Sequence, residues 1–79
     1  MFYRTKRHYE VLAYRNPDGE PYPMEQTTRK ADALRIGKAW AKLYDYVEVN
    51  AVYTNADDAT DVQGTVLIWS NATEQETTK

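Results

Sequence analysis

The sequence predicts a small α+β domain, a two-layer sandwich in which one amphipathic helix covers a sheet of three to four strands. Two observations lead to this fold class. Residues 28–44 repeat apolar residues at the spacing of one helix face and carry basic residues on the opposite side. Residues 45–54 and 62–70 alternate along their length as half-buried strands do. The expected element order is strand, edge segment, helix, strand, strand.

The first strand is expected from Lys6 to Arg15, a stretch rich in Tyr and Val. It ends at Asn16-Pro17-Asp18-Gly19, whose residues favour a tight turn closed by a left-handed glycine. Residues 20–26 then carry prolines at alternate positions, 21 and 23. Because proline cannot donate to a strand ladder, this segment is predicted to be an edge strand or an extended lead-in to the helix.

The helix is expected to begin at a side-chain cap supplied by Thr27 or Thr28. Its interior contains Gly37, which lies inside the apolar stripe and costs about 1 kcal/mol relative to alanine. A glycine on the buried side of a helix is explained by a close approach of the helix backbone to the sheet. We therefore predict a close approach of the helix backbone to the sheet at this residue.

The later strands are separated by a predicted polar loop over residues 55–61. Val47, Val49, Ala51 and Val66 are assigned to the helix-facing side of the sheet. If the first and second long strands run parallel, the helical crossover between them should be right-handed. The sequence leaves open whether the last strand lies between the others or at the outside.

Length and composition restrict the chain to modest architectures. The 79 residues allow one domain, predicted over residues 1–70, followed by a disordered polar tail over residues 71–79. Cysteine is absent, which excludes disulfides and thiolate metal sites. The sequence shows neither an apolar run of membrane-spanning length nor the apolar stretch of a secretory signal, so a cytoplasmic location is expected.

Charge is divided unevenly along the chain. Residues 1–43 carry nine Lys or Arg against five Asp or Glu, whereas residues 44–79 carry one Lys against seven Asp or Glu. The formal net charge of −2 therefore combines a basic half with an acidic half. Whether the molecule is electrically polar depends on how the fold mixes the two halves.

One helix can cover only one face of the predicted sheet. If Tyr9, Val47 and Val66 point at the helix, alternation sends a second apolar set to the other face. That set is Leu12, Tyr14, Tyr46, Val52, Leu67 and Trp69. Clustered exposed apolar groups are typical of a protein-binding or dimerisation face, which is our interpretation. The alternatives are that residues 20–26 cover part of the set, or that a small domain simply exposes these side chains.

The sequence contains few residues that could form a catalytic or metal-binding site. His8 and Glu10 share a strand face but are read as a solvated pair and not as a general base with its orienting partner. Asp57, Asp58 and Asp61 lack the ligand pattern of a calcium loop. No phosphate-binding glycine loop, zinc spacing or nucleophile motif occurs. We expect no enzyme activity, no metal, no cofactor and no small-molecule substrate.

Nucleic-acid binding is the alternative function. Basic residues occur near the start of the chain and along the outer helix face. They are Arg4, Lys6, Arg7, Arg35, Lys38 and Lys42. The sequence pI of about 5.3 argues against a surface driven by phosphate contacts, so a protein partner or a homodimer is the preferred expectation.

The element order resembles that of small βαββ proteins encoded by phages and other mobile elements. The resemblance covers residues 6–70 and rests on the turn, on Ala39-Trp40-Ala41-Lys42 and on Tyr46-Val47-Glu48-Val49. Some such proteins bind host proteins, and certain anti-CRISPR inhibitors are among them. The resemblance implies a regulator or inhibitor of a host protein. It carries over no functional residue.

Overall fold

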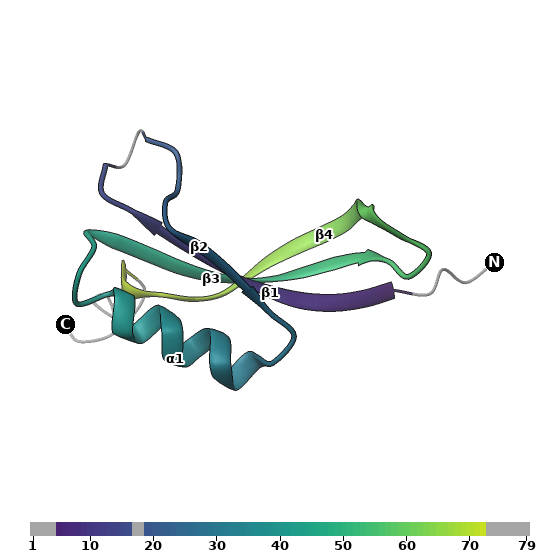
Figure 1. Cartoon of the computed structure of the whole chain (residues 1–79), viewed down its shortest axis with the longest axis horizontal. Coiled ribbons are helices and arrows are strands. Elements are labelled where there is room, and N and C mark those ends of the chain that lie inside the picture. Colours follow the sequence, from purple (N-terminus) through teal and green to yellow (C-terminus); the bar gives the residue numbers. More distant parts are fainter. Residues whose placement is uncertain (1–4, 17–18, 73–79) are drawn as a thin grey trace.

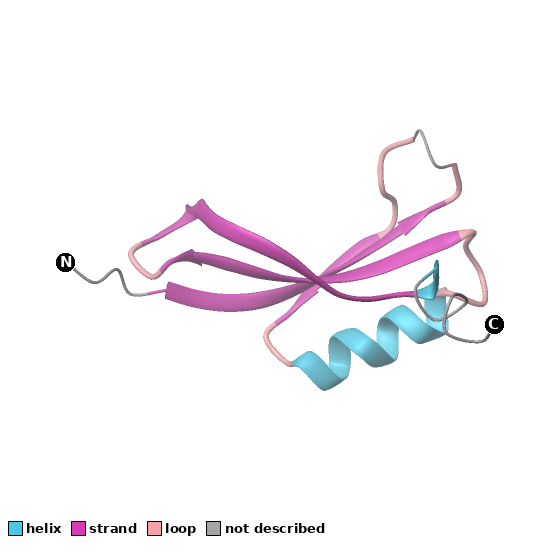
Figure 2. Ribbon diagram, turned by 180° about the vertical axis from the view of Figure 1, so that it is seen from behind, coloured by secondary structure: helices cyan, strands magenta, loops and turns pink. Residues whose placement is uncertain are grey.

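The computed structural model describes residues 5–16 and 19–72 and confirms the predicted α+β class (Figure 1). The elements in chain order are β1 Thr5–Tyr14, β2 Met24–Thr27, α1 Lys30–Trp40, β3 Tyr46–Asn55 and β4 Asp58–Ser70. The strands form one sheet in the order β2-β1-β3-β4, and each neighbouring pair is antiparallel. Helix α1 lies against one face of this sheet, so the domain has two layers (Figure 2).

The sheet order resolves the questions that the sequence left open. β1 and β3 are antiparallel, so the parallel arrangement considered for the two long strands does not occur. The helix instead connects β2 to β3, which lie on either side of β1. β4 pairs with β3 and forms an outer edge of the sheet.

The β1–β2 connection confirms the predicted turn and edge segment. The amide of Gly19 donates to the carbonyl of Asn16 over 3.0 Å, which closes the turn, although Gly19 does not have the left-handed φ that we expected. The amide of Tyr22 donates to the Ala13 carbonyl and the amide of Ala13 donates to the Pro23 carbonyl. β2 is therefore a short edge strand that directly follows Pro23.

Helix α1 begins later and ends earlier than the sequence pattern predicts. Its N-cap residue is Arg29, which has extended backbone angles and no side-chain cap bond. Thr27 does not cap the helix, because its hydroxyl accepts from the Arg29 amide in the turn that precedes it. After Trp40 the chain continues in a turn, where the Tyr44 amide donates to the Trp40 carbonyl.

The core lies between α1 and the middle of the sheet, as predicted. It consists of Tyr9, Val11, Ala13, Ala33, Val47, Val49 and Ala51. Gly37 allows the predicted close approach, because a β-carbon built on it would lie 2.7 Å from Val49 Cγ2. Val66 was assigned to this core, but its side chain is 53% exposed. It faces the helix side of the sheet at a position that α1 does not reach.

Helix α1 covers only one half of the sheet (Figures 1 and 2). β1, β3 and β4 run on beyond the start of the helix as a twisted three-stranded extension, which we call the distal arm. It comprises residues 5–8, 52–55 and 58–65. The arm accounts for the elongated shape of 45 × 25 × 20 Å.

The β3–β4 connection is tighter than the predicted loop over residues 55–61. β4 begins at Asp58, so only Ala56 and Asp57 separate the two strands. β4 is longer than the stretch of β3 that it pairs with, and the register shifts at three places. The extra residues are Ile68, Gln63 and residues 59–61, which lie between successive partners of β3. β-bulges of this kind bend a strand and increase its twist.

The predicted tail is folded at its first residue. Asn71 accepts a hydrogen bond from the Val47 amide over 3.1 Å and donates to the Asp45 carbonyl over 3.2 Å. The side chain therefore ties the end of β4 to the start of β3. Residues 73–79 of the predicted tail lie outside the described residues.

Candidate functional site

The open face is the side of the sheet opposite α1, and it contains five of the six residues predicted for partner binding. Val49 marks the helix side, because it lies beneath Gly37. Alternation along β3 then places Tyr46 and Val52 on the open face. Antiparallel register adds three more residues, since directly opposed side chains share a face. They are Tyr14 opposite Tyr46, Leu12 opposite Glu48 and Leu67 opposite Asn50.

Trp69 is the exception, and its predicted outward orientation is wrong. The bulge at Ile68 shifts the register so that Trp69 lies opposite Val49. Its ring atom Cζ3 would lie 3.3 Å from a β-carbon on Gly37, which places the indole under the helix. Trp69 packs against the core and is not part of the open face.

The open face is also less apolar and less exposed than predicted. Val52 is 3% exposed although no described element covers this face. Leu12, Tyr14 and Tyr46 are half-buried, so Leu67, at 50%, is the one member of the predicted set with a largely exposed side chain. Polar residues, among them Glu10, Glu48 and Asn50, occupy the positions between these apolar side chains.

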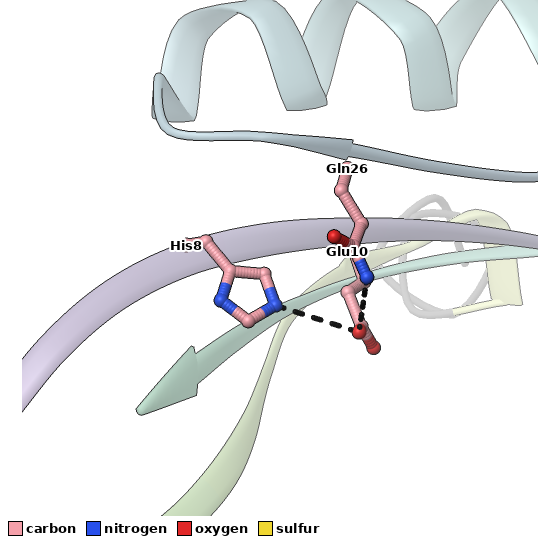
Figure 3. A network of polar contacts seen from close by, with 3 residues as sticks. All are labelled: His8, Glu10 and Gln26. Atoms are coloured by element: carbon pink, nitrogen blue, oxygen red, sulfur yellow. Dashed lines mark hydrogen bonds and ion pairs between the residues drawn. The ribbon is translucent and has the colours of Figure 1, made fainter. Parts of the chain in front are cut away.

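His8, Glu10 and Gln26 form a polar network on the open face (Figure 3). Gln26 Nε2 donates to Glu10 Oε2 over 3.2 Å, and His8 Nε2 lies 3.5 Å from the same oxygen. The His8–Glu10 pair that we predicted is thus formed, but both side chains are about three quarters buried, at 26% and 24% exposed. The network links β1 to β2 and stabilises that edge of the sheet.

A second polar cluster lies at the end of the open face, around Tyr14 and Tyr46. The two rings are 5.7 Å apart, and Asn50 donates to Glu48 over 2.6 Å beside them. Burial raises the pKa of both phenols above the usual value, and the Glu48 carboxylate raises it further. With a raised pKa, each phenol is neutral near pH 7, so both hydroxyl groups can donate as well as accept hydrogen bonds.

Two acidic residues of the β3–β4 hairpin, Asp58 and Asp61, accept hydrogen bonds from neighbouring residues. Asp58 accepts from both the amide and the hydroxyl of Thr60, and these hydrogen bonds lower the pKa of its carboxyl group. Asp61 accepts from Gln63 over 2.7 Å. Among the described residues, no group of three or more potential ligands is arranged to hold a metal ion.

The basic residues of the alternative function fall into two separate groups. Arg35, Lys38 and Lys42 lie exposed on or just after α1, where Arg35 pairs with Asp32 over 3.0 Å. The other group belongs to the distal arm, where Lys6 and Arg7 are neighbours on β1 and so point to opposite faces. Arg4 lies outside the described residues. The fold does not gather the five described positions on one surface.

The outer edge of β4 is the feature that sequence reasoning missed. Three of its apolar side chains are largely exposed: Val62 at 55%, Val66 at 53% and Leu67 at 50%. Val66 lies on the helix side of the sheet and the other two on the open face. A sequence signal was available, because Val62–Ser70 contains neither a charged residue nor a proline.

Gly64 adds open space to this edge. A β-carbon built on Gly64 would meet no atom within 4 Å. The glycine pairs with Tyr53 of β3, and Val66 lies two residues along on the same face. A small vacant position thus lies beside an exposed valine on a strand with one described strand neighbour.

Comparison with known proteins found no relative of this chain. No protein-family model matches it, and no curated protein or solved structure matches it either. Within the described part of the chain, α1 has 11 residues and no helix is long and apolar enough to cross a membrane.

Proposed function

We propose that this chain is a non-enzymatic protein-interaction module that binds an extended strand of another polypeptide along the outer edge of β4. The observation that carries the proposal is the combination of an edge strand of 13 residues with exposed Val62, Val66 and Leu67. Addition of a strand to a sheet edge is a common mode of peptide recognition. The backbone supplies affinity and alternating side chains supply specificity.

The contrast between the two sheet edges supports this proposal. Proteins protect exposed edges with short strands, prolines, charges and bulges. β2 has four residues and follows two prolines, so it is well protected. β4 has bulges near both ends, but its middle residues Gly64–Leu67 pair regularly with β3 and carry neither charge nor proline. This stretch is suited to accept another strand.

The open sheet face supports the proposal less well than the edge does. Of its apolar residues, Val52 is buried and Leu67 belongs equally to the β4 edge. We therefore assign the binding role to the edge and retain Leu67 from the predicted set. The resemblance to small mobile-element proteins that bind host proteins agrees with an interaction role and gives no partner.

The proposal is tested by introducing lysine at the edge. We expect Val62→Lys combined with Val66→Lys to abolish binding, because lysine on an edge strand opposes pairing with another strand. A tagged copy is incubated with a cell lysate to which untagged chain has been added, and retained polypeptides are identified. Leu43→Lys is the matched control, since Leu43 is 75% exposed and lies in the turn after α1, outside strand β4.

A retained polypeptide should be bound by the parent and by the Leu43→Lys control but not by the edge variant. Hydrogen exchange on the purified complex should then show added protection at amides of β4. Equal retention by all three chains, or protection confined to other strands, would overturn the proposal. Circular dichroism of each variant verifies that the fold is kept.

A further inference from the structure

We infer that the strand occupying the β4 edge is β4 of a second copy, paired antiparallel about a two-fold axis at Thr65. This inference rests on the proposed function and specifies its partner. The axis would stand perpendicular to the sheet, so that both helices lie on the same side of one continuous eight-stranded sheet. Such an interface requires only one self-complementary patch.

Asymmetry between the two edges of the sheet favours this closed arrangement. An open chain of copies would require β4 of one molecule to pair with β2 of the next. β2 is too short for that role, and the two prolines that precede it cannot donate to a ladder. The remaining edge is β4, and pairing β4 with β4 gives a dimer that stops at two copies.

The register follows from the geometry of β4. A perpendicular two-fold axis preserves the faces of the sheet, and directly opposed residues share a face. An axis between two residues would oppose neighbours that point to different faces, so the axis must pass at a residue. We place it within Gly64–Leu67, where β4 is regular. With the axis at Thr65, Gly64 of each copy lies opposite Val66 of the other copy, so this pair occurs twice in the dimer. The exposed valine then enters the position where Gly64 leaves open space.

Charge is compatible with the same register. The paired segment between Val62 and Ile68 carries no charged side chain. Asp58 and Asp61 of the two copies lie at opposite ends of the pairing, so no like charges are opposed. Because the regular stretch is only four residues long, the interface is small, and interfaces of low area belong to weak and transient complexes. The dimer should therefore depend on concentration.

Disulfide trapping tests the register directly. The chain contains no cysteine, so Thr65→Cys introduces a single thiol. Opposed cysteines at the two-fold axis should cross-link on mild oxidation at least about tenfold faster than Leu43→Cys, because pairing raises the effective thiol concentration. Val66→Cys is the neighbouring control and should cross-link more slowly. Equal rates for Thr65→Cys and Leu43→Cys would overturn the dimer, and a faster Val66→Cys would overturn this register.

A charge-swap experiment tests the dimer without a covalent bond. Thr65 is exposed, so Thr65→Lys and Thr65→Glu should both keep the fold. Each variant alone should sediment as a monomer, because like charges would meet at the axis. An equimolar mixture should restore the dimer. A mixture that stays monomeric overturns the self-pairing.

If the parent still captures a different protein through β4, the proposed function stands without the dimer. Unchanged capture by the Val62→Lys, Val66→Lys variant would instead overturn the proposed function itself.

Discussion

At the scale of single residues, Gly37 determines how closely the helix approaches the sheet. A β-carbon at this position would lie 2.7 Å from Val49 Cγ2 and 3.3 Å from the Trp69 ring. Val49 is fully buried in the core between the helix and the sheet. The absence of a side chain at residue 37 is therefore a packing requirement, and it explains a glycine in a helix interior.

Gly37→Ala should lower the free energy of unfolding by up to about 2 kcal/mol, because an overpacking cost of about 1–3 kcal/mol outweighs the roughly 1 kcal/mol of helix propensity that alanine adds. Urea melts followed by circular dichroism measure the change. Combining Gly37→Ala with Val49→Ala should make room for the new methyl group and give a favourable coupling of about 1 kcal/mol in a double-mutant cycle.

Ala39→Gly provides the control for backbone effects. Ala39 is an exposed residue of the same helix, so this change should cost about 1 kcal/mol through propensity alone. A Gly37→Ala variant more stable than the parent would mean that the helix stands farther from the sheet than the structure indicates.

At the scale of the elements, the end of β4 depends on Asn71. The bulge at Ile68 redirects the strand, and Asn71 then bonds the Val47 amide and the Asp45 carbonyl at the start of β3. The side chain satisfies a donor and an acceptor in the backbone that leads into a central strand. This contact holds the C-terminal end of β4, where Trp69 packs beneath the helix, against the start of β3.

Asn71→Ala should destabilise the domain by about 1–3 kcal/mol, the cost of leaving a partly buried backbone group without its partner. Thermal and urea denaturation measure the loss. Loosening of β4 should also increase hydrogen exchange at the Val47 amide in particular. Asn16→Ala, at an exposed position of the β1–β2 turn, should change stability by only about 0.5 kcal/mol. Similar losses in both variants would show that Asn71 has no special role.

At the scale of the whole molecule, the basic residues and the proposed binding edge occupy different places. Lys38 and Lys42 lie on the outer side of α1 or just after it, whereas the β4 edge extends along the distal arm. Lys6 and Arg7 point to opposite faces of that arm. Phosphate recognition by a contiguous basic surface is therefore not favoured by this arrangement.

Charge reversal separates the two functions. Changing Arg35, Lys38 and Lys42 to glutamate should leave strand binding by β4 unchanged, because these residues do not belong to the edge. Neither the parent nor this variant should retain a labelled oligonucleotide at moderate salt. If the parent retains it in a salt-dependent manner and the variant does not, nucleic-acid binding becomes the better account of this protein.

The sequence by itself determined the fold class, the core residues on β1 and β3, the edge position of the proline-containing segment and the close approach at Gly37. These features depend on periodicity and turn chemistry, which are local properties of the chain. Helix ends were less well predicted, because a threonine near the start of α1 bonds within the preceding turn instead of capping the helix.

Only the tertiary structure decided the position of Trp69 and the exposure of the β4 edge. Simple alternation sends Trp69 to the open face, but pairing with β3 inserts a bulge at Ile68 and turns the indole toward the helix. The helix covers half of the sheet because α1 has 11 residues and the strands continue past its start. Bulges and strand order arise from pairing between segments that are separated in the sequence. The local hydrophobic pattern therefore does not predict which strand will lie at a free edge of the sheet.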